Sequence, residues 1–359
     1  MSGEYMATTK AGAGHPQNQP AQSKSDGGGP SVSVVVPAYN VEDYVVACVQ
    51  SLMRQTYSDL EIVVVDDGST DRTGQLLDGL AEIEGSRLKV VHQSNGGLSM
   101  ARNNGLAASS GDFVCFVDGD DQVAPDMISV LVAALDVTGA ELACCGHATY
   151  TPEGMPSWSV PPYRVRVERQ PEALEETLYY RGAGTNAWAK LGPRELWMNH
   201  LFEPGLLYED LATIPGVIAD CDSIAVVDAA LYGFAVRPGS ITRTSRIRFD
   251  RVRDLSTAIE LCGLAEPENA SEALMSAFRA RRATELCRVI NLCDQASDDL
   301  SQVAKVRDKA EVELRRLAMR VITDSRAPIS LRMRVSLSAL VPIAYPLLWR
   351  LKKATEGWL

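Results

Sequence analysis

The sequence is poor in the residues that build metal centres and disulfide frameworks. Its 359 residues include only four histidines, and its eight cysteines form no CxxC pair. Scattered histidines make a His-based metal site unexpected, and cysteines inside apolar runs are typical of small core residues in a reducing compartment. The first thirty residues lack the apolar stretch of a cleavable signal peptide and are rich in Gly, Pro, Gln and Ser. We therefore interpret residues 1–30 as a disordered leader.

Basic residues are outnumbered as well. There are 35 Lys and Arg against 46 Asp and Glu, which gives a formal net charge of -11. A general nucleic-acid-binding protein would present a basic stripe, so no nucleic-acid partner is expected. Hydrophobic residues make up 46% of the chain, which is enough for a sizeable core in one large domain and a smaller one.

Short β-branched runs alternate with helical patterns from Ser31 to about residue 145. This alternation predicts an α/β domain built on a parallel sheet, with polar loops gathered at the carboxyl ends of the strands. Asn40 is a candidate cap for the first helix. The expected strands are residues 31–37, 60–65, 88–93, 112–118 and 141–145, and the expected helices are one after Asn40, 71–83, 98–108 and one opened by Pro125.

The pattern changes to long helices from Asp250 onward. Apolar residues recur there at helical spacing in three stripes, which we expect to pack on the α/β domain or on each other. A catalytic role is not expected in this region. The stripes are Val252, Leu255, Ile259 and Cys262; Leu274, Phe278, Leu286 and Val289; and Val306, Leu314, Leu317 and Val321.

Acidic residues follow two of the predicted strands, at the sheet edge where ligands bind. Asp66 and Asp67 precede a glycine that permits a sharp turn, and a carboxylate there can accept from a ribose hydroxyl or a base N–H. Asp118 and Asp120 are separated by one glycine, so a divalent ion could join both to a diphosphate. Mg²⁺ and Mn²⁺ favour such oxygen ligands. Aspartates are common in turns, and the position after an apolar strand is what makes this triplet indicative.

Five segments together resemble the family 2 glycosyltransferases, a large inverting group with a GT-A fold. They occur in the family's order over about Ser31 to Thr242, with Gly119 where the family's acidic motif commonly has serine. Because the carboxylates would be the ligands, this exchange is expected to be neutral. The segments read SVVVPAYN, SLMRQTYSDLEIVVVDDGSTD, NGGLSMARNNGLAASSGDFVCFVDGDD, NAWAKL and GLLYEDL.

The resemblance implies a GT-A, Rossmann-like fold with a mostly parallel sheet flanked by helices, and a divalent metal, Mn²⁺ or Mg²⁺. It implies that Arg102 helps hold the donor, and that Asp118 and Asp120 lie at the sugar, the diphosphate and the metal. The residues implied to surround the nucleotide are Pro37, Tyr39, Asn40, Asp66 and Asp67.

Simpler roles stay open for several of these residues. Asn40 could be only a helix cap, Arg102 a surface ion pair, and Asp121 a cap of the following segment. Arg237 and Arg243 are further candidates to meet the diphosphate from a loop.

An inverting transfer needs a general base for the acceptor hydroxyl and charge neutralisation for the departing diphosphate. A carboxylate suits the first task and a metal ion the second. The family's base is the Asp of a Glu-Asp pair, and Glu209 and Asp210 match it. We predict Asp210 as the base with Glu209 in support, the alternative being an acidic first helical turn. Trp188 and Lys190 are implied to border the acceptor site, although core packing explains Trp188 equally well.

The C-terminal end is a basic island on an acidic protein. Residues 335–349 carry no charge, and basic residues flank them on both sides. As a helix they would extend about 22 Å, short of the roughly 30 Å hydrocarbon core, and two prolines disfavour a clean span. The segment fits the interface of an anionic membrane, which predicts a cytoplasmic protein peripheral to the inner face of the cell membrane. The alternative is a helix packed on the protein.

Four parts are therefore expected: the leader 1–30, a GT-A domain 31–245, a helical domain 246–325 and a tail 326–359. The expected activity is transfer of a sugar from a nucleotide-sugar, UDP-linked on family grounds. The acceptor would be a hydroxyl of a glycan or lipid-linked molecule in cell-surface polysaccharide or glycoconjugate synthesis.

Two alternatives remain. A sugar nucleotidyltransferase would need a Gly-rich, basic phosphate loop after the first strand, which residues 35–43 do not offer. A non-catalytic nucleotide-sugar or lipid-binding scaffold would have no use for Asp118, Asp120 and Asp210.

Overall fold

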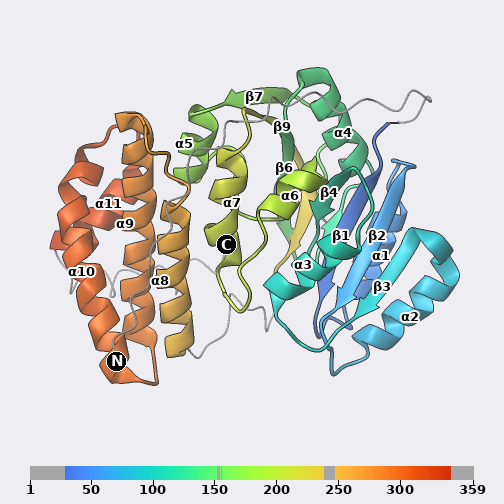
Figure 1. Cartoon of the computed structure of the whole chain (residues 1–359), viewed down its shortest axis with the longest axis horizontal. Helices are drawn as coiled ribbons and strands as arrows, with labels where there is room; N and C mark the ends of the chain where they lie inside the picture. The colour runs from blue at the N-terminus through green and yellow to red at the C-terminus, as the bar shows by residue number, and fades with distance from the viewer. Residues whose placement is uncertain (1–28, 152–153, 155, 238–246, 341–359) are drawn as a thin grey trace, which may run out of the picture.

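A computed structural model describes residues 29–151, 154, 156–237 and 247–340 of the chain. In this part of the chain a nine-stranded mixed sheet carries helices on both faces, and a group of long helices stands beside it (Figure 1). The strands are β1 (Val32–Ala38), β2 (Leu60–Asp66), β3 (Leu88–His92), β4 (Phe113–Phe116), β5 (Gln122–Val123), β6 (Leu142–Tyr150), β7 (Val165–Arg169), β8 (Lys190–Pro193) and β9 (Ser223–Ala235). The helices are α1 (Val45–Met53), α2 (Thr73–Glu84), α3 (Leu98–Ala108), α4 (Met127–Thr138), α5 (Glu172–Leu178), α6 (Arg194–Asn199), α7 (Glu209–Ala219), α8 (Phe249–Gly263), α9 (Glu272–Gln295), α10 (Leu300–Thr323) and α11 (Ile329–Leu340).

The sheet has a parallel half and a mixed half, in the order β3-β2-β1-β4-β8-β6-β9-β5, with β7 also paired to β9. Strands β3, β2, β1 and β4 are parallel neighbours, which confirms the expected parallel sheet for the first part of the chain. Strand β8 runs antiparallel to both β4 and β6. All seven residues of β1 are buried, as is typical of a parallel strand covered on both faces.

Successive side chains of β1 point to opposite faces of the sheet and enter two apolar cores. Val34 and Val36 pack with α1 and α4, whereas Val35 packs with α3 and α7. Gly105 lets α3 lie directly on the sheet, because an added Cβ would stand 2.3 Å from Cγ1 of Val35. This contact fixes the position of Arg102, which lies about one turn earlier in α3.

The interpretation of Asn40 as a helix cap is wrong. Helix α1 begins at Val45 and its N-cap position is Tyr44, which makes no side-chain cap hydrogen bond. Asn40 instead adopts a left-handed conformation with φ of 49°. Its Oδ1 accepts from the backbone N–H of Thr70 at 2.8 Å, so the side chain joins the ends of β1 and β2.

The long helices share one apolar core with a face of the sheet. This core runs from Phe116 and Trp197, through Ile214 of α7, to residues of α8, α9, α10 and α11. The three stripes expected from the sequence lie on α8, α9 and α10, and most of their residues are buried. Helix α7 lies between the sheet and the long helices (Figure 1).

The two ends of the chain are described only in part. The leader 1–28 and residues 341–359 lie outside the described residues, as does Arg243. Of the apolar stretch 335–349, the first residues belong to α11, where Val335 is 0% exposed and packs in the shared core. None of the described helices has the length and apolar character needed to cross a membrane. All eight cysteines are free thiols, and seven are buried, as expected for core residues.

Candidate active site

The ends of β2 and β4 meet on either side of the end of β1. The backbone N–H of Asp67 donates to the carbonyl of Ala38 at 2.9 Å, and that of Gly119 donates to the carbonyl of Pro37 at 3.1 Å. The loops that begin at Asp67 and at Gly119 therefore both contact the end of β1, as the parallel order predicts. Gly119 lies so close that an added Cβ would be 2.8 Å from the carbonyl oxygen of Pro37.

Arg102 of α3 joins the acidic motif after β4 to the acidic pair at the start of α7. Its guanidinium donates to Oδ1 of Asp118 at 2.9 Å, to Oε1 of Glu209 at 2.8 Å and to Oδ1 of Asp210 at 2.9 Å. The Arg102 side chain is only 1% exposed. Charge-assisted bonds of this kind are the strong ones, and burial reduces their screening by solvent. A surface ion pair, the simpler role left open for Arg102, is excluded by this burial.

Glu209, Asp210 and Arg102 shift one another's pKa values. Burial raises the pKa of Glu209 to about 8, and the neighbouring charge of Asp210 adds to the increase. Burial also raises the pKa of Asp210, against the opposing effect of Arg102. For Arg102 burial alone would lower the pKa, but the charges of Asp210, Asp118 and Glu209 raise it above its usual value. One permanent cation thus stands among three carboxylates.

The two members of the acidic pair differ in exposure. The side chain of Asp210 is 28% exposed, whereas that of Glu209 is 7% exposed. Asp210 also takes a hydrogen bond from the backbone N–H of Ala187, the residue before Trp188. Only Asp210 is therefore both held in place and open to a reacting molecule.

The remaining aspartates of the motif have different partners. Oδ2 of Asp120 accepts from Nε of Arg237 at 2.6 Å, and the two side chains are 21% and 16% exposed. Burial first, and the charge of Asp118 second, raise the pKa of Asp120. Asp121 is buried and accepts from the Tyr232 hydroxyl at 2.6 Å and the Ala235 N–H at 2.8 Å. Asp121 therefore anchors β9 and is not free to bind a ligand.

The donor set suits a divalent cation that brings its own additional ligands. Asp118 and Asp120 supply carboxylate oxygens, the ligands that Mg²⁺ and Mn²⁺ prefer. The pKa of Asp120 is raised by burial and then by the charge of Asp118, and a bound cation would offset both effects. Across the described ranges of the chain, no group of three or more His, Cys, Asp or Glu side chains is arranged to hold a metal ion. A diphosphate and water would thus have to complete the coordination.

Asp66 and Asp67 already have partners within the protein. Asp67 accepts from the N–H groups of Gly96 and Gly97 at 2.7 and 2.8 Å, and so holds the loop that leads into α3. Asp66 accepts from the Ser69 N–H at 3.1 Å, and its Oδ2 is 2.9 Å from Nδ1 of His92. The two aspartates lie beside the end of β1, and their contacts in this structure shape the loops there.

Sequence reasoning missed His92. Its Nε2 is 3.0 Å from Oδ1 of Asp78, and hydrogen bonds to Asp66 and Asp78 raise the pKa of its imidazole. A signal was present, because His92 ends β3 at the edge of the sheet where Asp66 ends β2. Two strand ends that pair in parallel bring their last side chains together.

The NAWAKL segment lies beside the acidic pair, and its two predicted acceptor residues differ in accessibility. Trp188 is partly buried and stacks on Tyr232 with ring centroids 4.5 Å apart. Lys190 is 0% exposed, and its Nζ donates to the carbonyl of Asn186 at 2.6 Å. Burial lowers the pKa of Lys190. In this conformation Lys190 is buried and stabilises the backbone at Asn186, and Trp188 is the more accessible of the two.

Known proteins resemble the chain in sequence. The profile of the family described as Glycosyl transferase family 2 matches residues 33–193. The chain is 35% identical over 220 residues to the uncharacterized glycosyltransferase EpsJ of Bacillus subtilis, over 59% of this chain and 63% of EpsJ. It is 33% identical over 224 residues to the glycosyltransferase GlyG of Streptococcus pneumoniae, over 59% of this chain and 73% of GlyG. The match spans only 31% of GlyA, another S. pneumoniae glycosyltransferase, so the chain covers less than two thirds of both EpsJ and GlyA.

The fold is also shared with a solved structure. The crystal structure of S. aureus TarS 1–349 in complex with UDP-GlcNAc matches with a TM-score of 0.64, at 19% sequence identity, over 89% of this chain and 92% of that one. At this identity the likeness concerns the fold. Together with the family match, it confirms the expected GT-A fold, with helices on the sheet and a C-terminal helical region. The sheet was expected to be mostly parallel and is mixed, because β5, β7 and β8 pair antiparallel with their neighbours.

Proposed function

The chain belongs to glycosyltransferase family 2, and on that basis we propose that it is an inverting glycosyltransferase. The donor is a nucleotide-sugar, and the acceptor is a hydroxyl group of a glycan or lipid-linked molecule. The observation that carries this proposal is Arg102, whose one buried guanidinium contacts Asp118 and both members of the acidic pair. A donor-side carboxylate and an acceptor-side carboxylate held this close suit a single displacement, in which both partners must be aligned.

The nucleotide would lie across the end of β1. Tyr39, with 46% of its surface exposed, is available there to stack on a base. Pro37, Asn40, Asp66 and Asp67 form the walls around it. A UDP-sugar is the favoured donor, because the similar S. aureus TarS structure is a complex with UDP-GlcNAc and because the family resemblance points the same way.

Asp210 is the general base. With a pKa of about 8, Glu209 keeps its proton at neutral pH and so removes one negative charge next to Asp210. Asp210, the more exposed of the two, is the member that we propose acts as the carboxylate base, and its raised pKa makes it a better acceptor for the proton of the incoming hydroxyl. Arg102 and the Ala187 N–H hold the carboxylate in place, which limits the motion needed before reaction.

The departing diphosphate would meet Asp118 and Asp120 with a divalent ion, Mn²⁺ or Mg²⁺. When bound, that ion supplies a positive charge to offset the charge that develops on the leaving group. Asp118 and Asp120 would hold the ion. Arg237, which donates to Oδ2 of Asp120, would stand next to the anionic diphosphate and add a second positive charge there.

The site faces the segment proposed to receive the acceptor, with Trp188 at its border. A cell-surface polysaccharide or glycoconjugate is the product class that we propose. The basic and apolar tail would hold the protein at the inner face of the cell membrane, near lipid-linked acceptors. Deleting residues 341–359 and fractionating cells tests that placement, because unchanged recovery with membranes would remove the tail from it.

The direct test is hydrolysis of nucleotide-sugars by the purified chain, with and without Mn²⁺. We expect release of the nucleoside diphosphate from UDP-sugars, dependent on the ion and lost in Asp210→Asn. Binding without turnover in any condition would favour the scaffold alternative. Release of a sugar phosphate and a nucleoside monophosphate would indicate other chemistry.

A further inference from the structure

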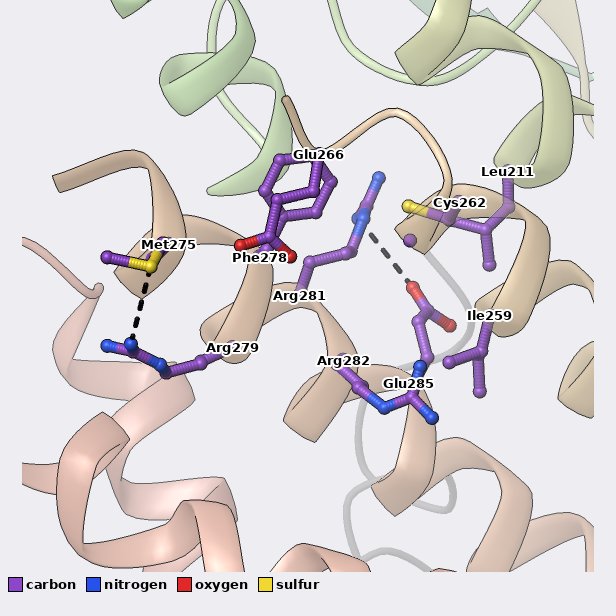
Figure 2. Close-up of a pocket in the computed structure, with 11 residues that line it drawn as sticks. Leu211, Ile259, Cys262, Glu266, Met275, Phe278, Arg279, Arg281, Arg282 and Glu285 are labelled. Atoms are coloured by element: carbon purple, nitrogen blue, oxygen red, sulfur yellow. Dashed lines mark hydrogen bonds and ion pairs between the residues drawn. The ribbon is translucent and has the colours of Figure 1, made fainter. Parts of the chain in front are cut away.

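A cavity lies among α7, α8 and α9. It has a volume of about 140 Å³, and its walls are mostly apolar: Leu211, Ile259, Cys262, Met275 and Phe278 line it. Leu211 directly follows Asp210 in α7, so the cavity touches the helix that carries the acidic pair but not the site itself. Figure 2 shows Arg281 reaching between these walls from α9.

Arg281 is a buried cation with unused hydrogen-bond donors. The residue is 2% exposed, and its Nη2 donates to Oγ1 of Thr185 at 2.8 Å. Among the described residues, Nε and Nη1 have no hydrogen-bond acceptor, and Nη1 stands 3.6 Å from Oε1 of Glu285. The guanidinium also lies over the ring of Tyr180, 3.7 Å from its centroid. Buried donors without acceptors are uncommon in proteins, because each loses its hydrogen bonds to water.

The neighbouring charges leave this cation incompletely balanced. Glu285 also accepts from Nη1 of Arg288 at 2.6 Å and from the Tyr180 hydroxyl. The two other arginines at the cavity pair elsewhere, Arg279 with Glu272 and Arg282 with Glu313. Glu266 lines the cavity as well, but it is exposed to solvent, which screens its charge.

We propose that this cavity binds a small carboxylic acid with an apolar body, whose carboxylate accepts from Nε of Arg281. A bond from a guanidinium N–H to a carboxylate is charge-assisted, and such bonds gain strength away from water. The apolar walls would enclose the hydrocarbon part. An engineered cavity of about 150 Å³ holds benzene, so this one has room for a body of that size.

The bound acid would lie next to two segments that adjoin the proposed glycosyltransferase site. Leu211 is covalently next to Asp210, and Thr185 lies in the segment that leads to Trp188. The binding proposal itself rests on the cavity and on Arg281, and it stands whether or not the chain transfers a sugar.

Isothermal titration of the full chain with benzoate, in the absence of any nucleotide-sugar, tests the proposal. Benzamide is the matched neutral probe, with the same ring and nearly the same shape. We expect saturable benzoate binding and at least about tenfold weaker benzamide binding. Only benzoate carries a negative charge that can pair with the Arg281 guanidinium. Equal affinities, or no saturable benzoate binding up to about 100 mM, where mM dissociation constants would be detected, would overturn the proposal.

Two variants locate the bound molecule. Arg281→Gln should weaken benzoate binding by about tenfold or more. Gly263→Leu should do so without touching Arg281, because an added Cβ at Gly263 meets nothing closer than Nη1 of Arg282 at 3.9 Å and the rest of the side chain fills the cavity. Arg315→Gln is the control: it removes an exposed arginine of α10 that pairs with Glu311 and does not line the cavity, and binding should stay within about twofold. If Arg281→Gln fails to fold, Gly263→Leu decides alone, and unchanged benzoate binding in that variant would contradict the assignment.

Discussion

Nη1 of Arg102 donates to Oδ1 of Asp210 at 2.9 Å, although 108 residues separate the two in the chain. The same guanidinium holds Asp118 at 2.9 Å. The two acidic motifs, which lie far apart in the sequence, therefore share one buried counter-ion. Substitutions of Arg102 and its acidic partners should distinguish their contribution to stability from their contribution to sugar transfer.

Asp210→Asn should abolish transfer while leaving the fold intact. The amide keeps the size of the side chain but has no basic oxygen to take the acceptor proton, so turnover should fall by about 10²- to 10⁴-fold. Nucleoside diphosphate release under saturating donor, with circular dichroism to check folding, measures this. Turnover like that of the unmodified chain would remove Asp210 from the mechanism.

Arg102→Met should destabilise the protein strongly. It leaves the carboxylates of Asp118, Glu209 and Asp210 facing one another without the cation that contacts all three, and breaking a buried pair in this way costs about 3–5 kcal/mol. The free energy of unfolding in urea measures the loss, which should be smaller at pH 5 than at pH 8 because protonation relieves the repulsion. Arg72→Met, which removes an ion pair to Glu42 from an arginine that is 72% exposed, is the control and should cost at most about 1 kcal/mol.

Glu209→Gln should change how stability depends on pH. The folded state raises the pKa of Glu209 from 4.5 to about 8 and so holds this proton to a higher pH than the unfolded chain does. The contribution of Glu209 to the free energy of unfolding therefore falls as pH rises between those values, and above pH 8 the charged form is penalised. Removing the titration should make the variant gain stability relative to the unmodified chain from pH 5 to pH 9, by urea unfolding. A constant difference over that range would contradict the raised pKa.

Asp120→Asn should change the response to Mn²⁺, whereas Asp121→Asn should lower the stability of the protein. Asp120 is proposed to bind the divalent ion, so its variant should lose most of the stimulation by Mn²⁺ and keep a near-normal melting temperature. Asp121 accepts from Tyr232 and Ala235 inside the protein, so its variant should lose about 1–3 kcal/mol of stability. Titrating Mn²⁺ in the hydrolysis assay, alongside thermal unfolding, distinguishes the two. Loss of the Mn²⁺ response in the Asp121 variant alone would assign the ligands the other way.

Gly119→Ser should destabilise this protein, although serine is common there in the family. An added Cβ would stand 2.8 Å from the Pro37 carbonyl oxygen and 3.3 Å from Cα of Ala38, so the backbone must shift. Overpacking of this kind costs about 1–3 kcal/mol. Thermal unfolding measures it, with Gly79→Ser as the control, because nothing lies within 4 Å of an added Cβ at Gly79. The structure thus gives a physical reason to doubt the expectation that the exchange is neutral.

Local pattern was enough to predict the first half of the fold. Helix α3 spans Leu98–Ala108, the range expected for the helix that follows Gly96 and Gly97, and the parallel order of β1 to β4 follows from buried runs alternating with helices. Strand β8 was not predicted, because a stretch of four residues that pairs antiparallel with two distant strands carries no periodicity of its own.

The site was predictable only where the chemistry lies within one short segment. The Asp-Gly-Asp triplet and the Glu-Asp pair are visible as adjacent carboxylates after an apolar run. The burial of Arg102 is not visible, because it depends on how closely α3 packs on β1 at Gly105. The bond between Arg237 and Asp120, and the contact of His92 with Asp66, likewise join strand ends that only the folded sheet brings together.

The apolar core that runs from the sheet through α7 into the long helices has a consequence for how this chain can be altered. The two parts share this one apolar core, so exchanging residues from Phe249 onward for the equivalent helices of a relative would also change the surface on which α7 packs. A chimera joined near residue 245 would present mismatched apolar surfaces along α7, the helix that begins with Glu209 and Asp210. A change in the helical part must therefore be accommodated by the residues that pack against α7, the helix proposed to carry the base.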